Sequence, residues 1–312
     1  MKRLFLQIHR WLALVFAAPL ATLIATGLIL SFEPIAQQVA ITPGSVSPDA
    51  ILNLLRTHDP QNQARGIAYR PYDGAVTIDG PAGRATIGLD GAPRVEGRLA
   101  SLFGASRRLH EHLTLFRLDL TIVSTCAMLA LIAFGALLGL PRLRNNVAGW
   151  HKGVAWGLLP FVVLSPLTGL FMAWGVTLNP VSEAQPPRTP PLPLAQAADV
   201  VARERDLSDL IWLRQRAGRQ VARLWDGREA RVFLVTREGL LPMARNVSRL
   251  VHEGNLAGAW TGALNVIVSL AFTLLLGTGL WLFGRRELRA YASRRRASAK
   301  AKRDPSPTRS GA

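Results

Sequence analysis

Four long apolar stretches constrain this chain more than any other feature. They run roughly over residues 11–33, 115–140, 153–176 and 256–284. Each is long enough to cross about 30 Å of hydrocarbon, which takes about 20 helical residues. The mean hydropathy of +0.20 and the charged content of only 18% agree with this interpretation. The sequence therefore predicts an α-helical membrane protein built on a four-helix transmembrane bundle.

The first apolar stretch begins like a secretory signal peptide, with Lys2 and Arg3 ahead of it. A signal core has roughly 7–15 apolar residues and ends at a small-residue cleavage motif. This stretch is longer, and no such motif follows it. We therefore predict that it stays in the protein as a membrane span.

Basic residues mark one side of the predicted bundle. They precede the first span, fill the link between the second and third spans, and follow the fourth span. Lysine and arginine in short loops indicate the cytoplasmic side. The residues concerned are Lys2, Arg3, Arg10, Arg142, Arg144, Lys152 and the tail 285–303. Both termini are therefore expected in the cytoplasm, with the long connections outside it, in the periplasm if the cell is Gram-negative.

With their flanking residues, the spans divide the chain into alternating segments. The formal net charge of +17 lies largely in the basic tail, where contact with anionic lipid is expected rather than nucleic acid binding. We expect this tail to be disordered. The predicted segments are spans at 1–33, 107–140, 153–176 and 251–284, outer modules at 34–106 and 177–250, a cytoplasmic link at 141–152, and the tail at 285–312.

Each outer connection resembles a small α+β unit that begins with a helix. In the first, Ser47 and Pro48 start a predicted helix over 47–58, because serine caps helices and proline suits the first turn. The strand-like runs GIAYR, GAVTID and RATIGLD follow. The second unit has a predicted helix over 194–205 and the runs RQVARLW and ARVFLVT, after a Pro-rich extended lead-in at 186–194.

Several classes of site are excluded by what the sequence lacks. Cys126 is the one cysteine, which excludes an intrachain disulfide, a cysteine-held iron–sulfur cluster and a c-type haem motif. The outer segments contain no Gly-rich phosphate loop, nucleophile elbow or C-x-x-C. No catalytic acid, base or nucleophile is therefore predicted.

A histidine-centred repeat runs through the chain. His9 stands 18 residues before the glycine of one TGL motif, and His151 stands 18 residues before the glycine of another. His110 and His252 each precede a glutamate, and each stands 25 residues before a glycine. The pattern thus indicates two copies of one repeat unit, which consists of a helix, an outer module and a second helix. The glycines at these offsets are Gly27, Gly169, Gly135 and Gly277.

The repeat places the four histidines at two depths of the predicted bundle. His9 and His151 lie at the cytoplasmic side, and His110 and His252 lie at the outer side. Histidine near hydrocarbon is costly and commonly functional. Two facing imidazoles in an apolar bundle suit a six-coordinate haem iron. Two such pairs predict two b-type haems and an electron path across the membrane.

Two competing uses of these histidines fit the pattern less well. A structural zinc ion needs four ligands at one point, and the histidines are split between two faces. A proton relay needs ionisable residues at mid-depth, and the spans offer almost none. The glycines have two interpretations of equal weight, namely close helix packing or room for a flat macrocycle. Those considered for the second use are Gly27, Gly135, Gly169 and Gly279.

The stretch RRLHEHL offers two ligand candidates, His110 and His112. Residues two apart on a helix point about 200° apart, so both cannot face one haem. The following glutamate and the 25-residue offset favour His110. A rival count of 27 residues, from His112 to Gly139 and from His252 to Gly279, favours His112.

The histidine motifs resemble the PepSY-associated transmembrane helix family, which includes iron-regulated inner-membrane proteins and ferric-siderophore reductases. The resemblance covers residues 1–290. It implies axial haem ligands at His9, His151, His110 and His252. The family pattern has a leucine directly before the second-span histidine, which selects His110. Val251, the residue before His252, departs from that pattern. The motifs are IHRWLAL, RRLHEHL, GWHKGVAWG with SPLTGLFMAW, and LVHEGNLAG with GTGLWLFGRR.

The resemblance implies a di-haem protein that reduces a ferric siderophore in the periplasm and releases Fe(II), using an unidentified cytoplasmic or quinol electron donor. The alternative is a non-enzymatic membrane protein whose PepSY modules bind a ligand or partner. Six outer arginines are candidates for attracting an anionic complex, although a solvated basic surface is the simpler interpretation. They are Arg203, Arg205, Arg214, Arg216, Arg219 and Arg223.

Overall fold

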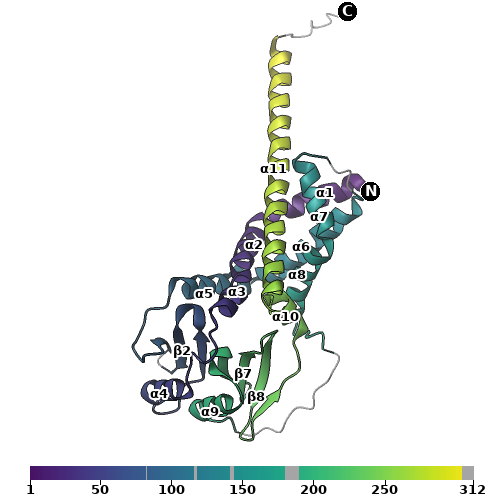
Figure 1. The fold of residues 1–312 in the computed structure, drawn as a ribbon. Helices are drawn as coiled ribbons and strands as arrows, with labels where there is room; N and C mark the ends of the chain where they lie inside the picture. The colour runs from purple at the N-terminus through teal and green to yellow at the C-terminus, as the bar shows by residue number, and fades with distance from the viewer. Residues whose placement is uncertain (82, 116–117, 141–143, 180–189, 304–312) are drawn as a thin grey trace, which may run out of the picture.

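The computed structural model is elongated, with a helical bundle, a sheet domain at one end of it, and a single helix that projects from the other end (Figure 1). It describes residues 1–81, 83–115, 118–140, 144–179 and 190–303. Three predictions fall partly outside the described residues. They concern Arg142 of the cytoplasmic link, the Pro-rich lead-in before residue 190, and the tail after residue 303.

Among the described residues, three helical segments are long and apolar enough to cross a membrane. A fourth span is possible if two helices that meet at 66° count as one. The three are Ala17–Ala40, comprising α2 (Ala17–Ser31) and α3 (Glu33–Ala40), then α6 (Leu120–Leu137), and the Ala259–Ala299 part of α11 (Ala259–Arg303); the bent pair is α7 (Val147–Gly157) and α8 (Leu159–Ala173).

The predicted spans are interrupted near their histidines. A separate helix α1 (Lys2–Val15) precedes α2, with the interruption at Phe16. The predicted span 107–140 begins too early, because α5 (Arg98–Glu111) and a short hairpin precede α6. Asp119 ends this hairpin and starts α6 by accepting two backbone N–H groups. The hairpin strands are β4 (Thr114–Leu115) and β5 (Leu118–Asp119).

Proline accounts for the bend between α7 and α8. Pro160 lies at the start of α8, directly after the break at Leu158. Proline has no backbone N–H and its ring collides with the preceding turn, so a helix bends or ends before it. The predicted third span is therefore two short helices rather than one straight one.

The last predicted span is also divided. A short helix α10 (Val247–Glu253) ends at Gly254, whose φ of 72° stops it, and α11 begins five residues later. The prediction of a disordered tail is wrong up to Arg303, because α11 continues to that residue (Figure 1). The tail is rich in alanine and arginine, both good helix formers, and has no proline before Pro305.

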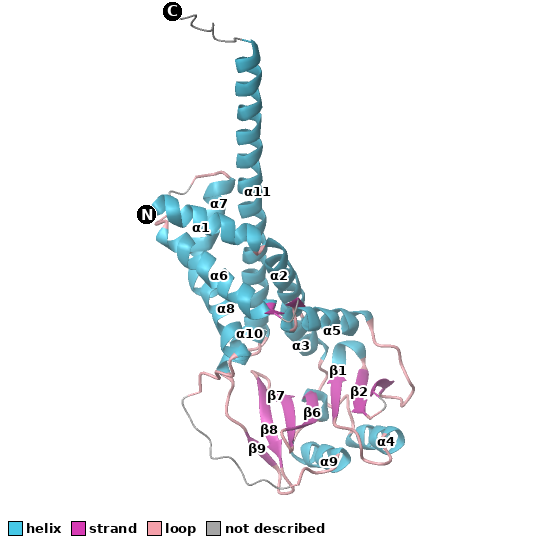
Figure 2. Ribbon diagram, turned by 180° about the vertical axis from the view of Figure 1, so that it is seen from behind, coloured by secondary structure: helices cyan, strands magenta, loops and turns pink. Residues whose placement is uncertain are grey.

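The helices pack in two equivalent sets, as the repeat predicts. The contact of α1 with α6 corresponds to that of α7 with α11. The contact of α5 with α2 corresponds to that of α10 with α8. The two halves meet through α6 against α8 and α2 against α11 (Figure 2). Each half thus repeats the same pairing of a histidine-bearing helix with a longer apolar helix.

The two predicted outer modules share one antiparallel sheet of seven strands, which corrects the expectation of two separate units. Its order is β3-β2-β1-β6-β7-β8-β9, and β1 of the first module pairs with β6 of the second. The strands are β1 (Gly66–Arg70), β2 (Ala75–Gly80), β3 (Gly83–Gly88), β6 (Leu210–Arg216), β7 (Arg219–Trp225), β8 (Ala230–Val235) and β9 (Leu240–Pro242).

One face of this sheet is covered by two helices, α4 (Pro48–His58) and α9 (Leu194–Glu204), which also contact each other (Figure 2). Together they enclose the largest apolar core, which includes Ile51, Val201 and Leu213. Both predicted helices are confirmed, and Ser47 caps α4 by accepting from the N–H of Ala50. Two 3₁₀ turns complete the domain, η1 (Pro71–Asp73) and η2 (Leu207–Asp209).

Gly66 lies where β1 pairs with β6, and we expect its replacement to destabilise the sheet. A β-carbon on Gly66 would lie 2.8 Å from the β-carbon of Arg214, which is too close. We expect Gly66→Ala to lower the stability of the sheet domain by about 1–3 kcal/mol. Thermal unfolding of the detergent-solubilised protein measures the effect.

Gly80→Ala on β2 is the matched control, because the nearest atom to its β-carbon would be 3.8 Å away. Equal unfolding midpoints for the two variants would contradict the close approach of β1 and β6.

Candidate functional site

Four histidines lie in two pairs at opposite ends of the bundle. The helices α5 and α10, which carry His110 and His252, lie at the end of the bundle next to the sheet (Figure 2). The ring centres of these two histidines are 6.1 Å apart. His9 on α1 and His151 on α7 lie at the far end, close enough for their charges to interact. Each pair joins one histidine from each half of the repeat. The sheet-side histidines lie on the short helices α5 and α10, not on the spans themselves.

Backbone carbonyls fix the ring of one histidine in each pair. Nδ1 of His9 lies 3.0 Å from the carbonyl oxygen of Leu131, and Nδ1 of His252 lies 3.0 Å from that of Ser165. A carbonyl oxygen only accepts hydrogen bonds, so Nδ1 must carry the proton. In the neutral ring, Nε2 then keeps a free lone pair.

Threonine hydroxyls fix the other two rings in the same way. Nδ1 of His110 lies 3.0 Å from Oγ1 of Thr26, which donates its own proton to the carbonyl of Thr22. Nδ1 of His151 lies 2.8 Å from Oγ1 of Thr278, which donates to Leu274. A hydroxyl has one proton to donate, so each threonine must accept from the imidazole. All four histidines therefore share the Nδ1–H tautomer.

A glycine lies against the edge of each of these rings. A β-carbon on Gly169 would lie 2.9 Å from Cε1 of His252, and one on Gly27 would lie 3.2 Å from Cε1 of His110. At the far end, the corresponding distances are 3.6 Å from Gly135 to His9 and 3.5 Å from Gly279 to His151. Gly169 and Gly27 thus let the sheet-side imidazoles approach the backbone of a neighbouring helix in the same half of the chain, whereas the far-end distances are ordinary van der Waals contacts.

The structure changes one equivalence in the repeat. Gly277, which stands 25 residues after His252, has no atom within 4 Å of its would-be β-carbon, and neither has Gly139. The equivalent of Gly135 is Gly279. The second half therefore contains two more residues between His252 and Gly279 than the first half contains between His110 and Gly135. The count of 27 residues that favoured His112 relies on Gly139, which touches no histidine.

The remaining two histidines lie outside both pairs. His112 follows the last residue of α5 and is exposed. His58 lies on α4 of the sheet domain, and its Nε2 is 3.3 Å from the carbonyl oxygen of Gly91. The structure therefore brings His110, and not His112, next to His252.

The sheet-side pair has dimensions that fit one metal ion between two imidazoles. Two imidazoles that hold a metal from opposite sides have ring centres roughly 6 Å apart, because each metal–nitrogen bond is about 2 Å long. The observed 6.1 Å agrees with this geometry. No Nε2 atom of the four histidines has a hydrogen-bond partner among the described residues.

The paired arrangement places two imidazoles at each end of the bundle. In the described part of the chain, no group of three or more His, Cys, Asp or Glu side chains is placed to hold a metal ion. A metal bound here would need further ligands other than these side chains, such as water or a cofactor. An iron porphyrin meets this need, since it supplies four nitrogens and leaves two axial positions open.

An ion pair connects the sheet to the helix that carries His252. Nη2 of Arg223 on β7 lies 2.7 Å from Oε2 of Glu253, and both side chains are largely buried. Burial raises the pKa of Glu253, but the positive charges of Arg223, Arg249 and Arg107 outweigh it and hold the pKa at about 2. Glu253 therefore stays ionised and keeps α10 attached to the sheet.

The comparison with known families agrees with this architecture. The model of the PepSY-associated TM region family matches residues 6–286 of the chain. The protein belongs to this family. No curated protein matches it. The PepSY-associated protein is accordingly a multi-pass membrane protein with an antiparallel sheet domain, and the match takes in all four histidines and both halves of the repeat.

Sequence reasoning found the four histidines of this PepSY-associated protein but not their hydrogen-bond partners. Thr26 and Thr278 each begin a TGL motif, but the histidine repeat is counted to glycines alone. Thr26 and Thr278 lie directly before the ring-contacting glycines Gly27 and Gly279. In the apolar spans of the sequence, a polar residue beside a glycine was the signal that could have revealed them.

The glycine contacts predict a difference between two helix positions. We expect Gly169→Ala to destabilise the protein by about 1–3 kcal/mol, because the new methyl group would displace the ring of His252. Gly277→Ala is the matched control and should leave stability unchanged or raise it slightly, because alanine favours helices. Thermal unfolding midpoints compare the two. Equal losses in both variants would show that the glycine does not position the ring.

The ion pair on α10 predicts a second difference. We expect Glu253→Gln to destabilise the protein by about 3 kcal/mol, because it leaves the buried guanidinium of Arg223 without its countercharge. Glu111→Gln removes an exposed carboxylate 3.5 Å from Arg107 and should cost less than about 1 kcal/mol. Unfolding at neutral pH measures both. A larger loss for Glu111→Gln would refute the anchoring role of Glu253.

Proposed function

We propose that this protein is a di-haem b transmembrane electron-transfer protein that reduces a ferric siderophore at its sheet-side face. The observation that carries the proposal is the arrangement of four histidines in two cross-half pairs. Each ring is held by its Nδ1–H and leaves Nε2 available. The axial ligands would be His9 with His151 and His110 with His252.

The chain's own groups explain how such cofactors would be held. Hydrogen bonds from Nδ1 fix the ring orientation and raise the basicity of Nε2, as is usual for metal-bound histidine. Two haems held by these histidine pairs would supply one-electron transfer in preference to oxygen binding. The apolar faces of α2, α6, α8 and α11 would surround them and exclude water.

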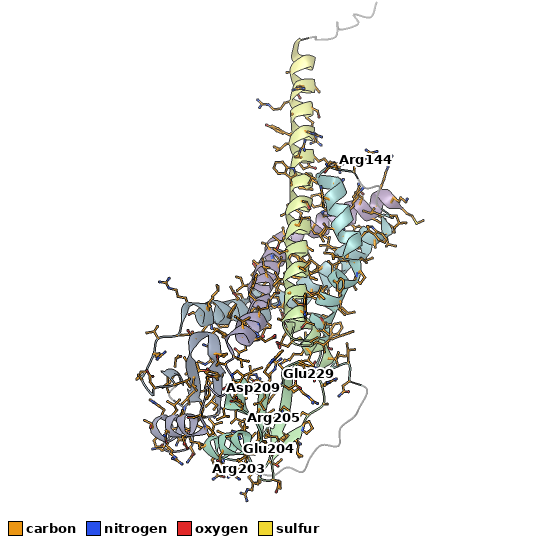
Figure 3. All side chains as sticks on the ribbon, in the orientation of Figure 1. Arg144, Arg203, Glu204, Arg205, Asp209 and Glu229 are labelled. Carbon is orange, nitrogen blue, oxygen red and sulfur yellow. The ribbon has the colours of Figure 1, made fainter. Side chains whose placement is uncertain are left out.

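The basic residues support one orientation in the membrane. Arg144 lies at the end of the bundle opposite the sheet (Figure 3), and the basic end of α11 projects on the same side. Positive charge favours the cytoplasm. The sheet domain is then periplasmic in a bacterial inner membrane, and an unidentified cytoplasmic or quinol donor supplies electrons at the His9 and His151 end.

The reaction needs one electron per iron and no proton transfer by the protein. Fe(III) in the siderophore becomes Fe(II), and the siderophore itself is unchanged. The hard oxygen ligands of a siderophore hold the more highly charged ferric ion better, so Fe(II) is released. This agrees with the expectation that no catalytic acid, base or nucleophile of the protein takes part.

A spectrum of the purified protein tests the proposal. We expect a b-type absorption spectrum that changes on reduction with dithionite, and about two haems per chain. His151→Ala should remove one haem and His252→Ala should remove the other, because each loses an axial ligand. Quantifying haem per polypeptide for each variant measures this.

His112→Ala is the control, since His112 is exposed and belongs to neither pair. It should retain both haems. A colourless protein from haem-replete cells would contradict the proposal and favour the non-enzymatic ligand- or partner-binding role. Loss of haem in His112→Ala would contradict the choice of His110.

A further inference from the structure

The structure separates the outer arginines that the sequence grouped together. Arg203 forms an ion pair with Asp199 one turn away on α9, and Arg205 lies 5.5 Å from the ring of Phe233. Figure 3 shows both beside α9, on the side of the sheet away from the bundle. These two have ordinary partners and need no further explanation. Arg214 and Arg223 on the central strands differ.

Arg214 and Arg223 lie on the sheet face opposite the helix-covered core. Leu213 pairs with Ala222 in register, and both are buried in that core. Because successive side chains of a strand alternate between faces, Trp212, Arg214 and Arg223 point to the other face. This face is turned toward α10, since Arg223 reaches Glu253 there.

Positive charge on this face exceeds its countercharge. Glu253 serves both Arg223, at 2.7 Å, and Arg249, at 3.7 Å. Arg223 is only 7% exposed. Its Nε and that of Arg249 are buried without a hydrogen-bond partner. Buried polar groups in native proteins nearly always have partners, so the Nε of Arg223 indicates a missing acceptor. The Nε of Arg249 faces Oε1 of Glu253 at 3.7 Å, beyond hydrogen-bond distance.

Arg214 adds a third guanidinium to this surplus. It lies 4.1 Å over the ring of Trp212 and forms no ion pair with the described residues. Burial lowers the pKa of Arg214, and the charges of Arg216, Arg249 and Arg223 lower it further. The charge of Asp79 opposes this shift, but Arg84 already pairs with Asp79.

We propose that Trp212, Arg214, Arg223 and Arg249 form a binding site for a polyanionic metal chelate whose outer oxygens are carboxylates or catecholates. Guanidinium groups bind such oxygens in a bidentate, charge-assisted manner. The site lies beside Glu253, the residue that follows His252, so a bound chelate would sit next to the sheet-side histidine pair. The inference rests on the proposed function for the identity of the metal and selects anionic over neutral ferric complexes as its substrate.

Gallium chelates test the site without any electron transfer, because Ga(III) has the size and charge of Fe(III) but is not reduced. Isothermal titration of the full-length, detergent-solubilised protein with Ga(III)–citrate should show binding. A neutral Ga(III) tris-hydroxamate should bind more weakly by about tenfold or more. Equal affinity for the two chelates would overturn the proposal.

The variant Arg214→Gln should weaken Ga(III)–citrate binding by about tenfold, because one charged hydrogen-bond donor is lost. Arg203→Gln, on the opposite side of the sheet, is the matched control and should bind as the unchanged protein does. Arg249 lies on α10, outside the sheet, so Arg249→Gln provides a second test of the site if Arg214→Gln does not fold. It should weaken Ga(III)–citrate binding by a similar factor. Unchanged binding in a folded variant of either Arg214 or Arg249 would refute the site.

The outcomes separate this inference from the proposed function. If the protein contains no haem but binds Ga(III)–citrate through Arg214, the anion site stands and the electron-transfer function fails. If both haems are present but Ga(III)–citrate does not bind, the site is overturned and the function stands with another substrate class.

Discussion

The hydrogen bond from Nδ1 of each paired histidine to a neighbouring helix is the interaction on which the rest of the structure depends. In every case the acceptor belongs to the same half of the chain as the histidine: Leu131 for His9, Thr26 for His110, Thr278 for His151 and Ser165 for His252. The bond fixes the tautomer and the ring plane. Each half of the chain therefore presents two histidines with a free Nε2. The other half supplies the second histidine of each pair. At the sheet-side pair, a glycine beside each ring makes this approach possible.

The sheet domain is likewise completed only when the two halves of the chain come together. Each half contributes strands that leave one edge open, and the pairing of β1 with β6 closes the two edges against each other. An unpaired edge strand would expose backbone donors and acceptors to other chains. Arg223 and Glu253 then connect this shared sheet to α10. The position of His252 thus depends on the sheet as well as on the bundle.

The sequence predicted local elements well and their partners poorly. Apolar length found the membrane segments, and Ser47 with Pro48 marked the start of α4, because these signals lie within a few residues. Hydropathy does not record the direction of the backbone, so the interruption at Phe16 was missed. The joining of β1 to β6 is a contact between residues far apart in sequence. The equivalence of Gly135 with Gly279 needed the geometry, because two extra residues shift the count.

Electron paramagnetic resonance of the oxidised, purified protein at low temperature tests the central claim most directly. The claim is that each end of the bundle offers two histidine nitrogens to one iron. The account predicts two low-spin ferric haem signals, and a reduced spectrum that does not change when carbon monoxide is added. A high-spin ferric signal, or carbon monoxide binding to either reduced haem, would show an axial position without histidine and would contradict the pairing.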